Sequence, residues 1–230
     1  MNALRFTLAD GAAIEVVPTR LVVAGWTGRD HAAIEHHIEE LVRIGVPRPS
    51  AVPLYYRLGA ALLTQAESVE MLGEASSGEA EPVLVRQGGR WWLSVGSDHT
   101  DRHVEAYSVV VSKQLCAKPV SRTAWPWDDV AARADDLVLR SEIFEAGGWV
   151  SYQEGTVGAI RPLQSLIDGL PADVRVEDGF VLFCGTLSAL PNPAGVAIRA
   201  AERMRVELVD TARSRRIAHE YRVQALPVVA

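Results

Sequence analysis

Short segments in which apolar and polar residues alternate recur along this chain, and they constrain its fold more than any other feature. Near the N-terminus, alternation through residues 4–8 is followed by an Asp-Gly turn and a returning segment over 14–17. Near the C-terminus, two alternating segments cover 204–208 and 217–223. Alternation with period two places every second side chain on one face of a strand, so each pair predicts an antiparallel hairpin.

Two or three helices and several further strands complete the expected organisation. Thr27 and Asp30 have the spacing of a helix cap, which predicts a helix over about 30–44. Thr156 is expected to cap a second helix that ends at Ile167. Further strands are expected over 21–24, 69–72, 82–85, 91–95, 107–111 and 180–184. These elements predict an α+β protein built around a curved mixed sheet, with residues 1–20 as a hairpin appended to a core domain over 21–230.

Charge and cysteine usage exclude several classes of protein. The net charge of −6 argues against a surface that coats nucleic acid. No apolar run approaches the roughly 20 residues of a membrane span, and the N-terminus lacks the pattern of a signal peptide. Cys116 and Cys184 lie in apolar surroundings without the spacing of metal ligands, so we expect buried, reduced thiols. We therefore expect a cytoplasmic protein without a nucleic-acid or membrane partner.

The helix expected over 30–44 carries one histidine that could act as a general base. Its periodicity turns His37 toward the apolar face, with His31 at the other border of that face, and turns His36 toward solvent. Glu40 follows His37 by three residues, so the two side chains can meet. A carboxylate beside an imidazole fixes its tautomer, as a general base requires. A half-buried structural histidine with a solvated glutamate fits the same pattern.

Acidic residues mark a candidate cation site. Glu79 and Glu81 are two residues apart at the entry to a strand, which would place both carboxylates on one side. Paired carboxylates repel each other unless a cation lies between them, and hard divalent ions favour such ligands. The turn 96–103 adds Asp98 and four more ionisable residues. A polar loop edge and a charged turn are the alternatives that need no function.

Taken in order, several segments resemble the fumarylacetoacetate hydrolase superfamily, in a divergent bacterial branch. The segments are WTGRDHAAIEHHIEE, PLYYRL, GEAEPVLV, VEAYSVVVSKQ, YQEGTVGAIRPLQSLI and VEDGFVLFCGT. In that superfamily an H-x-x-E segment precedes an E-x-E strand, a Y-T-x-x-N-D stretch, a Q-x-G-N-T segment and a G-T turn. The resemblance covers roughly residues 20 to 223. It implies an α+β fold with a mixed β-sheet roll or barrel and a few peripheral helices.

The resemblance also implies roles for particular residues. His37 and Glu40 match the pair that activates water, and Glu79 and Glu81 match two ligands of a divalent metal, Mg²⁺ or Mn²⁺. The residues that match substrate-binding positions are Tyr56, Arg57, Gln153, Thr156, Gly185 and Thr186. Arg57 stands where a lysine is usual.

One position departs from the superfamily pattern. Where the third metal ligand, an aspartate, is expected, this chain has Ser112-Lys113. Either Asp98, His99 or Asp101 supplies the missing ligand, or Lys113 itself occupies the cation site, because an ammonium beside two carboxylates keeps its charge. The expected metal is therefore in doubt.

The resemblance predicts an enzyme that acts on a small 2-oxo or 3-oxo carboxylic acid. Hydrolysis of a C–C bond in an acylpyruvate-like compound is the expected reaction, with Lys113 or a metal stabilising an enolate. Decarboxylation, hydration and isomerisation are alternatives, and so is a non-catalytic protein that binds small carboxylates after losing its metal. Because 225–230 is apolar and superfamily members pair through their sheets, we also expect a homodimer.

Overall fold

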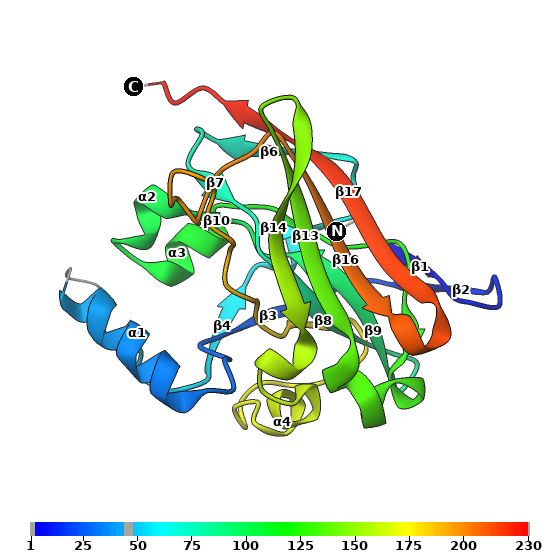
Figure 1. Cartoon of the computed structure of the whole chain (residues 1–230). Helices are drawn as coiled ribbons and strands as arrows, with labels where there is room; N and C mark the ends of the chain where they lie inside the picture. The colour runs from blue at the N-terminus through cyan, green and yellow to red at the C-terminus, as the bar shows by residue number, and fades with distance from the viewer. Residues whose placement is uncertain (1–2, 44–47, 230) are drawn as a thin grey trace.

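Two β-sheets carry most of the chain, which the computed structural model describes over residues 3–43 and 48–229, apart from the side chains of residues 37, 40 and 41. The six-stranded sheet contains, in spatial order, β12 (Trp125–Pro126), β9 (Arg90–Ser97), β8 (Ala80–Gln87), β15 (Phe180–Phe183), β3 (Arg20–Gly25) and β4 (Leu54–Leu58). The five-stranded sheet contains β14 (Gly148–Thr156), β13 (Val138–Glu145), β16 (Arg203–Asp210), β17 (Arg215–Leu226) and β6 (Ser68–Leu72). In Figure 1 the five-stranded sheet lies in front of the six-stranded one.

The main apolar core lies between these sheets. Leu84 of β8 and Leu93 of β9 belong to the same buried cluster as Val206 of β16 and Ile217 of β17. A second cluster, which contains Val83, covers the opposite face of the six-stranded sheet. Because β8 is covered on both faces, it carries a continuous apolar run rather than an alternating one.

Both predicted hairpins are confirmed. β1 (Leu4–Thr7) pairs antiparallel with β2 (Ala13–Val16), and β16 pairs antiparallel with β17. Leu4 and Val16 are buried in the second core cluster together with residues of β3. The division into 1–20 and 21–230 stays a prediction.

Four α-helices and several short elements complete the described part of the chain. The helices are α1 (His31–Arg43), α2 (Arg102–Glu105), α3 (Val109–Gln114) and α4 (Leu163–Asp168). The short strands are β5 (Leu63–Thr64), β7 (Ser76–Ser77), β10 (Thr100–Asp101) and β11 (Lys118–Pro119), and short 3₁₀ helices cover 60–62, 127–129, 131–136, 157–159 and 211–213. The helix predicted over 30–44 is confirmed as far as Arg43; residue 44 lies outside the described residues. Its cap is Asp30 and not Thr27, because the Asp30 carboxylate accepts hydrogen bonds from the amides of Ala32 and Ala33.

Two sequence-based assignments are wrong. Residues 107–111 form no strand: α3 begins at Val109, and the Ser108 hydroxyl caps it by accepting a hydrogen bond from the Val111 amide. Thr156 ends β14 and precedes the 3₁₀ helix 157–159, but its side chain makes no cap hydrogen bond, and the α-helix begins only at Leu163. Pro162 precedes α4 and sets its start, since proline fits the N-terminal end of a helix.

The predicted α+β class with a mixed sheet and peripheral helices is confirmed. The two large sheets remain separate, so the described residues form an open roll rather than one closed barrel. Within 3–43 and 48–229, no helix is long and apolar enough to cross a membrane.

Candidate active site

The ends of the inner strands β8, β9 and β15 meet on one side of the six-stranded sheet. Glu81 lies near the start of β8, and its carboxylate accepts a hydrogen bond of 2.8 Å from the amide of Gly185, which follows β15. Gly185 has a φ of +96°, and a Cβ there would lie 1.7 Å from Thr27 Oγ1. Only glycine therefore lets the backbone approach Thr27 and still donate to Glu81.

Three carboxylates form a cluster at these strand ends. Glu79 precedes β8, Glu81 lies in it, and Asp98 follows β9, the neighbouring strand. Oxygens of all three lie within 4.8 Å of one another. Glu81 and Asp98 are 2% and 0% exposed, and Glu79 is half-buried. The predicted placement of Glu79 and Glu81 side by side is confirmed, and Asp98 joins them.

The ammonium of Lys113 lies inside this carboxylate cluster. Its Nζ donates to Asp98 Oδ2, to Thr100 Oγ1 at 3.1 Å and to Glu79 Oε2 at 3.5 Å. Lys113 is in the last turn of α3, so the helix that replaced the expected strand carries it to the cluster. The sequence left Asp98 and Lys113 as alternatives for this place, and the structure brings both there.

A second lysine, Lys118, also contacts the cluster, and no pattern in the sequence pointed to it. It is 0% exposed, and its Nζ lies 3.3 Å from Asp98 Oδ1. Its Nζ also donates to the backbone carbonyls of His99, Lys113 and Cys116. Lys118 therefore holds the backbone of Lys113 and the carboxylate of Asp98 in one arrangement.

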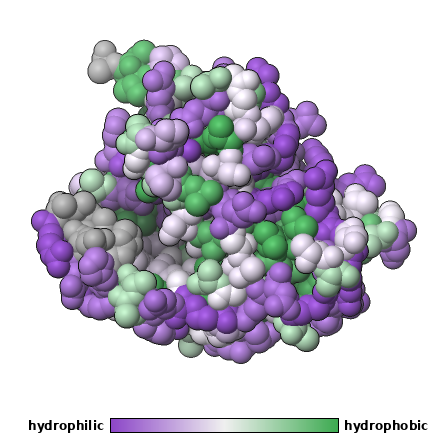
Figure 2. Space-filling view, viewed as in Figure 1, coloured by the Kyte–Doolittle hydropathy of each residue, from purple (hydrophilic) through white to green (hydrophobic). Residues whose placement is uncertain are grey.

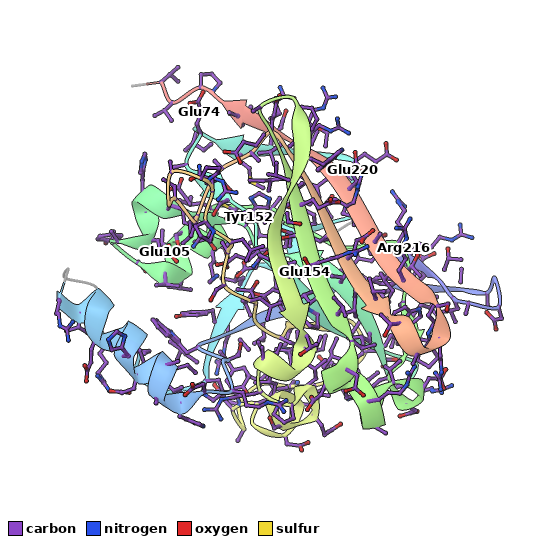
Figure 3. All side chains as sticks on the ribbon, viewed as in Figure 1. Glu74, Glu105, Tyr152, Glu154, Arg216 and Glu220 are labelled. Carbon is purple, nitrogen blue, oxygen red and sulfur yellow. The ribbon has the colours of Figure 1, made fainter. Side chains whose placement is uncertain are left out.

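An arginine pairs with the outer side of the cluster. Arg102, the first residue of α2, lies 3.1 Å from Glu79 Oε1 and donates to Ser77 Oγ at 2.6 Å. Its guanidinium also pairs at 3.0 Å with Glu105, the last residue of α2, which Figure 3 labels. The side chain of Glu79 is thus held between Arg102 and Lys113.

Burial and neighbouring charges separate the protonation of these groups. Burial raises the pKa of Glu81 well above its usual range, and the charge of Asp98 adds to this. For Asp98, burial acts in the same sense, but Lys113 and Lys118 outweigh it and lower the pKa. For Lys113, burial would lower the pKa, but Asp98 and Glu79 outweigh it and raise it. The cluster therefore combines a permanent ammonium with a carboxyl group that readily keeps a proton.

The imidazole of His99, the residue after Asp98, is buried and neutral. His99 contacts Ser76 Oγ through Nδ1 at 2.8 Å and the hydroxyl of Tyr221 through Nε2 at 2.7 Å. Burial, reinforced by the charge of Lys118, lowers the pKa of His99 to about 3. The imidazole therefore joins the cluster to the five-stranded sheet without adding a charge.

Two predicted substrate residues, Gln153 and Thr186, hold the backbone of the cluster through hydrogen bonds. Gln153 accepts a hydrogen bond from the amide of Ala80 at 2.9 Å and donates to Thr186 Oγ1 at 2.7 Å. Thr186 in turn donates to the carbonyl of Ala80 at 2.7 Å. Both side chains thus hold the residue that stands between Glu79 and Glu81.

Other predicted substrate residues lie differently. Arg57 is exposed and pairs with Asp173 at 2.7 Å, and Thr156 is exposed at the end of β14, so the structure does not bring either to the cluster. The Tyr56 hydroxyl accepts a hydrogen bond of 3.2 Å from Trp26 Nε1. Burial raises the pKa of Tyr56, and the nearby Lys113 lowers it in part.

The predicted catalytic pair lies on α1, but the side chains of His37 and Glu40 are outside the described residues. Figure 1 shows α1 on the same flank of the molecule as α2 and α3. His31, expected at the border of the apolar face, is instead exposed, with Nε2 3.3 Å from Arg161.

The fit of this cluster to a divalent metal depends on Lys113. Three carboxylates are oxygen ligands of the kind that hard divalent cations bind. However, Lys113 already donates to two of them, and an ammonium has no lone pair to offer a metal. A metal and Lys113 in its present position exclude each other, so the residues as arranged do not fit a bound ion.

Several solved structures share the fold of this chain. A candidate fumarylpyruvate hydrolase from Burkholderia cenocepacia has a TM-score of 0.67 at 17% identity, over 99% of this chain and 97% of that one. A protein assigned to the fumarylacetoacetate hydrolase family from Yersinia pestis CO92 has a TM-score of 0.68 at 16% identity, over 97% and 100%. A 2-keto-3-deoxy-D-arabinonate dehydratase complexed with magnesium and 2,5-dioxopentanoate has a TM-score of 0.64 at 14% identity, over 94% and 77%. The fold is therefore that of the fumarylacetoacetate hydrolase-like proteins.

The sequence itself specifies a family. Residues 24–221 match the family described as "Protein of unknown function (DUF2848)", and the chain belongs to this family. The search of curated proteins found no match. The bacterial branch expected from the sequence stays a prediction.

Proposed function

We propose that the protein is an enzyme that acts on a small 2-oxo or 3-oxo carboxylic acid at the Glu79–Glu81–Asp98 cluster. The observation that carries this proposal is the buried ammonium of Lys113 among these carboxylates, at the ends of the inner strands. The fold is shared with a dehydratase whose structure contains 2,5-dioxopentanoate. A positive charge in a site that excludes water binds an oxo acid and stabilises the enolate that forms from it.

Hydrolysis of an acylpyruvate-like compound is the reaction we favour. Water adds to the acyl carbonyl, the C–C bond breaks, and the electron pair of that bond becomes the enolate of the leaving oxo acid, which then takes up a proton. Lys113 would stabilise the enolate oxygen. His37 and Glu40 stay the candidates for activating the water, on the sequence resemblance alone.

The test is a screen of acylpyruvates and simple 2-oxo acids as substrates. Turnover is detected as a loss of enolate absorbance, and the products are identified by NMR. Turnover should fall at least 100-fold in Lys113→Met, which removes the ammonium that stabilises the enolate, and stay near wild type in Arg57→Gln, because Arg57 pairs with Asp173 away from the cluster. Products that retain all carbons would favour a hydratase or isomerase, and released CO₂ a decarboxylase. Binding without turnover across the panel would support a non-catalytic carboxylate-binding protein instead.

We further propose that two copies of the chain pair as a homodimer in a reducing compartment such as the cytoplasm. Val228 and Val229 are 71% and 85% exposed, and hydrophobic residues gather at this end of the chain at the top of Figure 2. Figure 3 labels Arg216 and Glu220 on β17, and the hollow that they line also contains Arg205 and Glu207. A surface that carries both signs of charge suits a self-complementary contact. Buried free thiols at Cys116 and Cys184 support the compartment.

A further inference from the structure

The use of lysine in this chain is confined to the carboxylate cluster. Of the 23 basic residues, only Lys113 and Lys118 are lysines, and the rest are arginines. Both lysines are buried, and both lie within ion-pair distance of Asp98. An ammonium is a compact point charge, whereas a guanidinium is a broad planar fork, so lysine suits a small site enclosed by carboxylate oxygens.

The position of Lys113 is over-determined. Its Nζ has acceptors on Asp98, Thr100 and Glu79, which matches the three donors of an ammonium. Its backbone carbonyl accepts from Lys118, so both ends of the residue are held. Its side chain is 8% exposed.

The cluster already holds its cationic partners. Glu79 and Asp98 lie within ion-pair distance of three basic groups, which are Lys113, Lys118 and Arg102, and Glu81 readily keeps a proton. A divalent ion would add two positive charges to this arrangement and would have to expel Lys113 from its acceptors. Leaving a buried ammonium without partners is strongly unfavourable, so the exchange is opposed.

We propose that Lys113 is the permanent cation of this site and takes the place of a divalent metal, so that the protein works without one. In the neighbouring dehydratase, a magnesium ion accompanies the bound oxo acid. That Lys113 occupies the cation position is independent of the proposed function; only its action on an enolate rests on that function.

The two lysines make a direct test available in the wild-type protein. With lysine labelled by ¹³C, the side chains give two Cε signals, both from the cluster, and Mn²⁺ bound among the carboxylates would broaden both by paramagnetic relaxation. At one equivalent of Mn²⁺ we expect both signals to stay sharp. Loss of both signals at one equivalent would overturn the proposal, whether or not the protein turns over any oxo acid.

Substitution tests the same claim from the other side. Lys113→Asp removes the ammonium and adds an oxygen ligand, and we expect its Mn²⁺ and Mg²⁺ affinities in calorimetry to be at least tenfold higher than those of the wild type. Gln114→Asp is the matched control, because it adds the same carboxylate one residue away, where Gln114 contacts the amide of Gly59.

Equal metal affinity in the wild type and Lys113→Asp would contradict the proposal, as would an equal gain in Gln114→Asp. If Lys113→Asp does not fold, the Mn²⁺ titration of the wild type decides alone. Absence of turnover in the substrate screen would contradict the proposed function but would leave both metal measurements unchanged.

Discussion

Lys118→Met is the substitution that most directly tests how the cluster is held together. The side chain is 0% exposed, and methionine has a similar length, so the change removes the charge without opening a large cavity. Three backbone carbonyls, those of His99, Lys113 and Cys116, would lose their donor, and Asp98 would lose one of its two ammonium partners.

The cost follows from these contacts. A hydrogen bond from a charged donor contributes about 1.5–3 kcal/mol, and the removal of one partner from a buried ion pair costs about 3–5 kcal/mol. These contributions overlap at one Nζ atom, so we expect the free energy of unfolding to fall by about 3–5 kcal/mol. Because most domains have about 5–15 kcal/mol in total, the variant should be measurably folded yet much weaker.

Urea denaturation followed by tryptophan fluorescence measures this change. Arg57→Met is the control: Arg57 and its partner Asp173 have side chains 55% and 67% exposed, and such surface pairs contribute little to stability. The double variant Lys118→Met/Asp98→Asn should lose less than the sum of its single variants, since it no longer leaves the Asp98 charge short of a partner. A loss in Lys118→Met no larger than that in Arg57→Met would refute the reasoning.

Three further predictions concern catalysis, assembly and pH. His37→Ala should abolish turnover while folding is retained, and His36→Ala should be nearly silent; equal effects on activity would contradict the assignment of the base. Light scattering at micromolar concentration should give the mass of a dimer, and deletion of 225–230 should weaken it, whereas a monomeric mass would exclude this pairing. The pKa of His99 is about 3 in the folded protein and near 6.5 in the unfolded chain, so between these values the unfolded chain binds the proton more readily. The free energy of unfolding should therefore fall as pH drops below 6.5, by about 2 kcal/mol at pH 5. Urea denaturation at pH 7.5 and pH 5 should show this loss in the wild type and not in His99→Gln, and equal pH dependence in both would contradict it.

Local signals in the sequence predicted the hairpins and α1 because each depends on neighbours in the chain. Segment 107–111 misled for the same reason: a run of three valines favours a strand, but the Ser108 cap and the contacts of Lys113 with the cluster stabilise a helix. Propensity is a weak guide where distant contacts decide, and here they decide the site itself.

The candidate site was predicted only in part. Glu79 and Glu81 follow from strand periodicity, and Asp98 and Lys113 were both considered, but no local rule shows that the two would bind each other. Lys118 escaped notice because most of its partners are backbone carbonyls, which no residue pattern reveals. Arg57 was misplaced because its partner lies 116 residues further along the chain.

A crystal structure of the protein grown with oxalate, which resembles the enolate of a small 2-oxo acid, tests the central claim most directly. We expect an oxalate oxygen within about 3.2 Å of Lys113 Nζ, in place of the longest contact of that ammonium, the one of 3.5 Å to Glu79 Oε2, with no divalent ion beside it. Oxalate bound only among the arginines on the outer face of β16 and β17, such as Arg205 and Arg216, would contradict the assignment of the cluster as the substrate site.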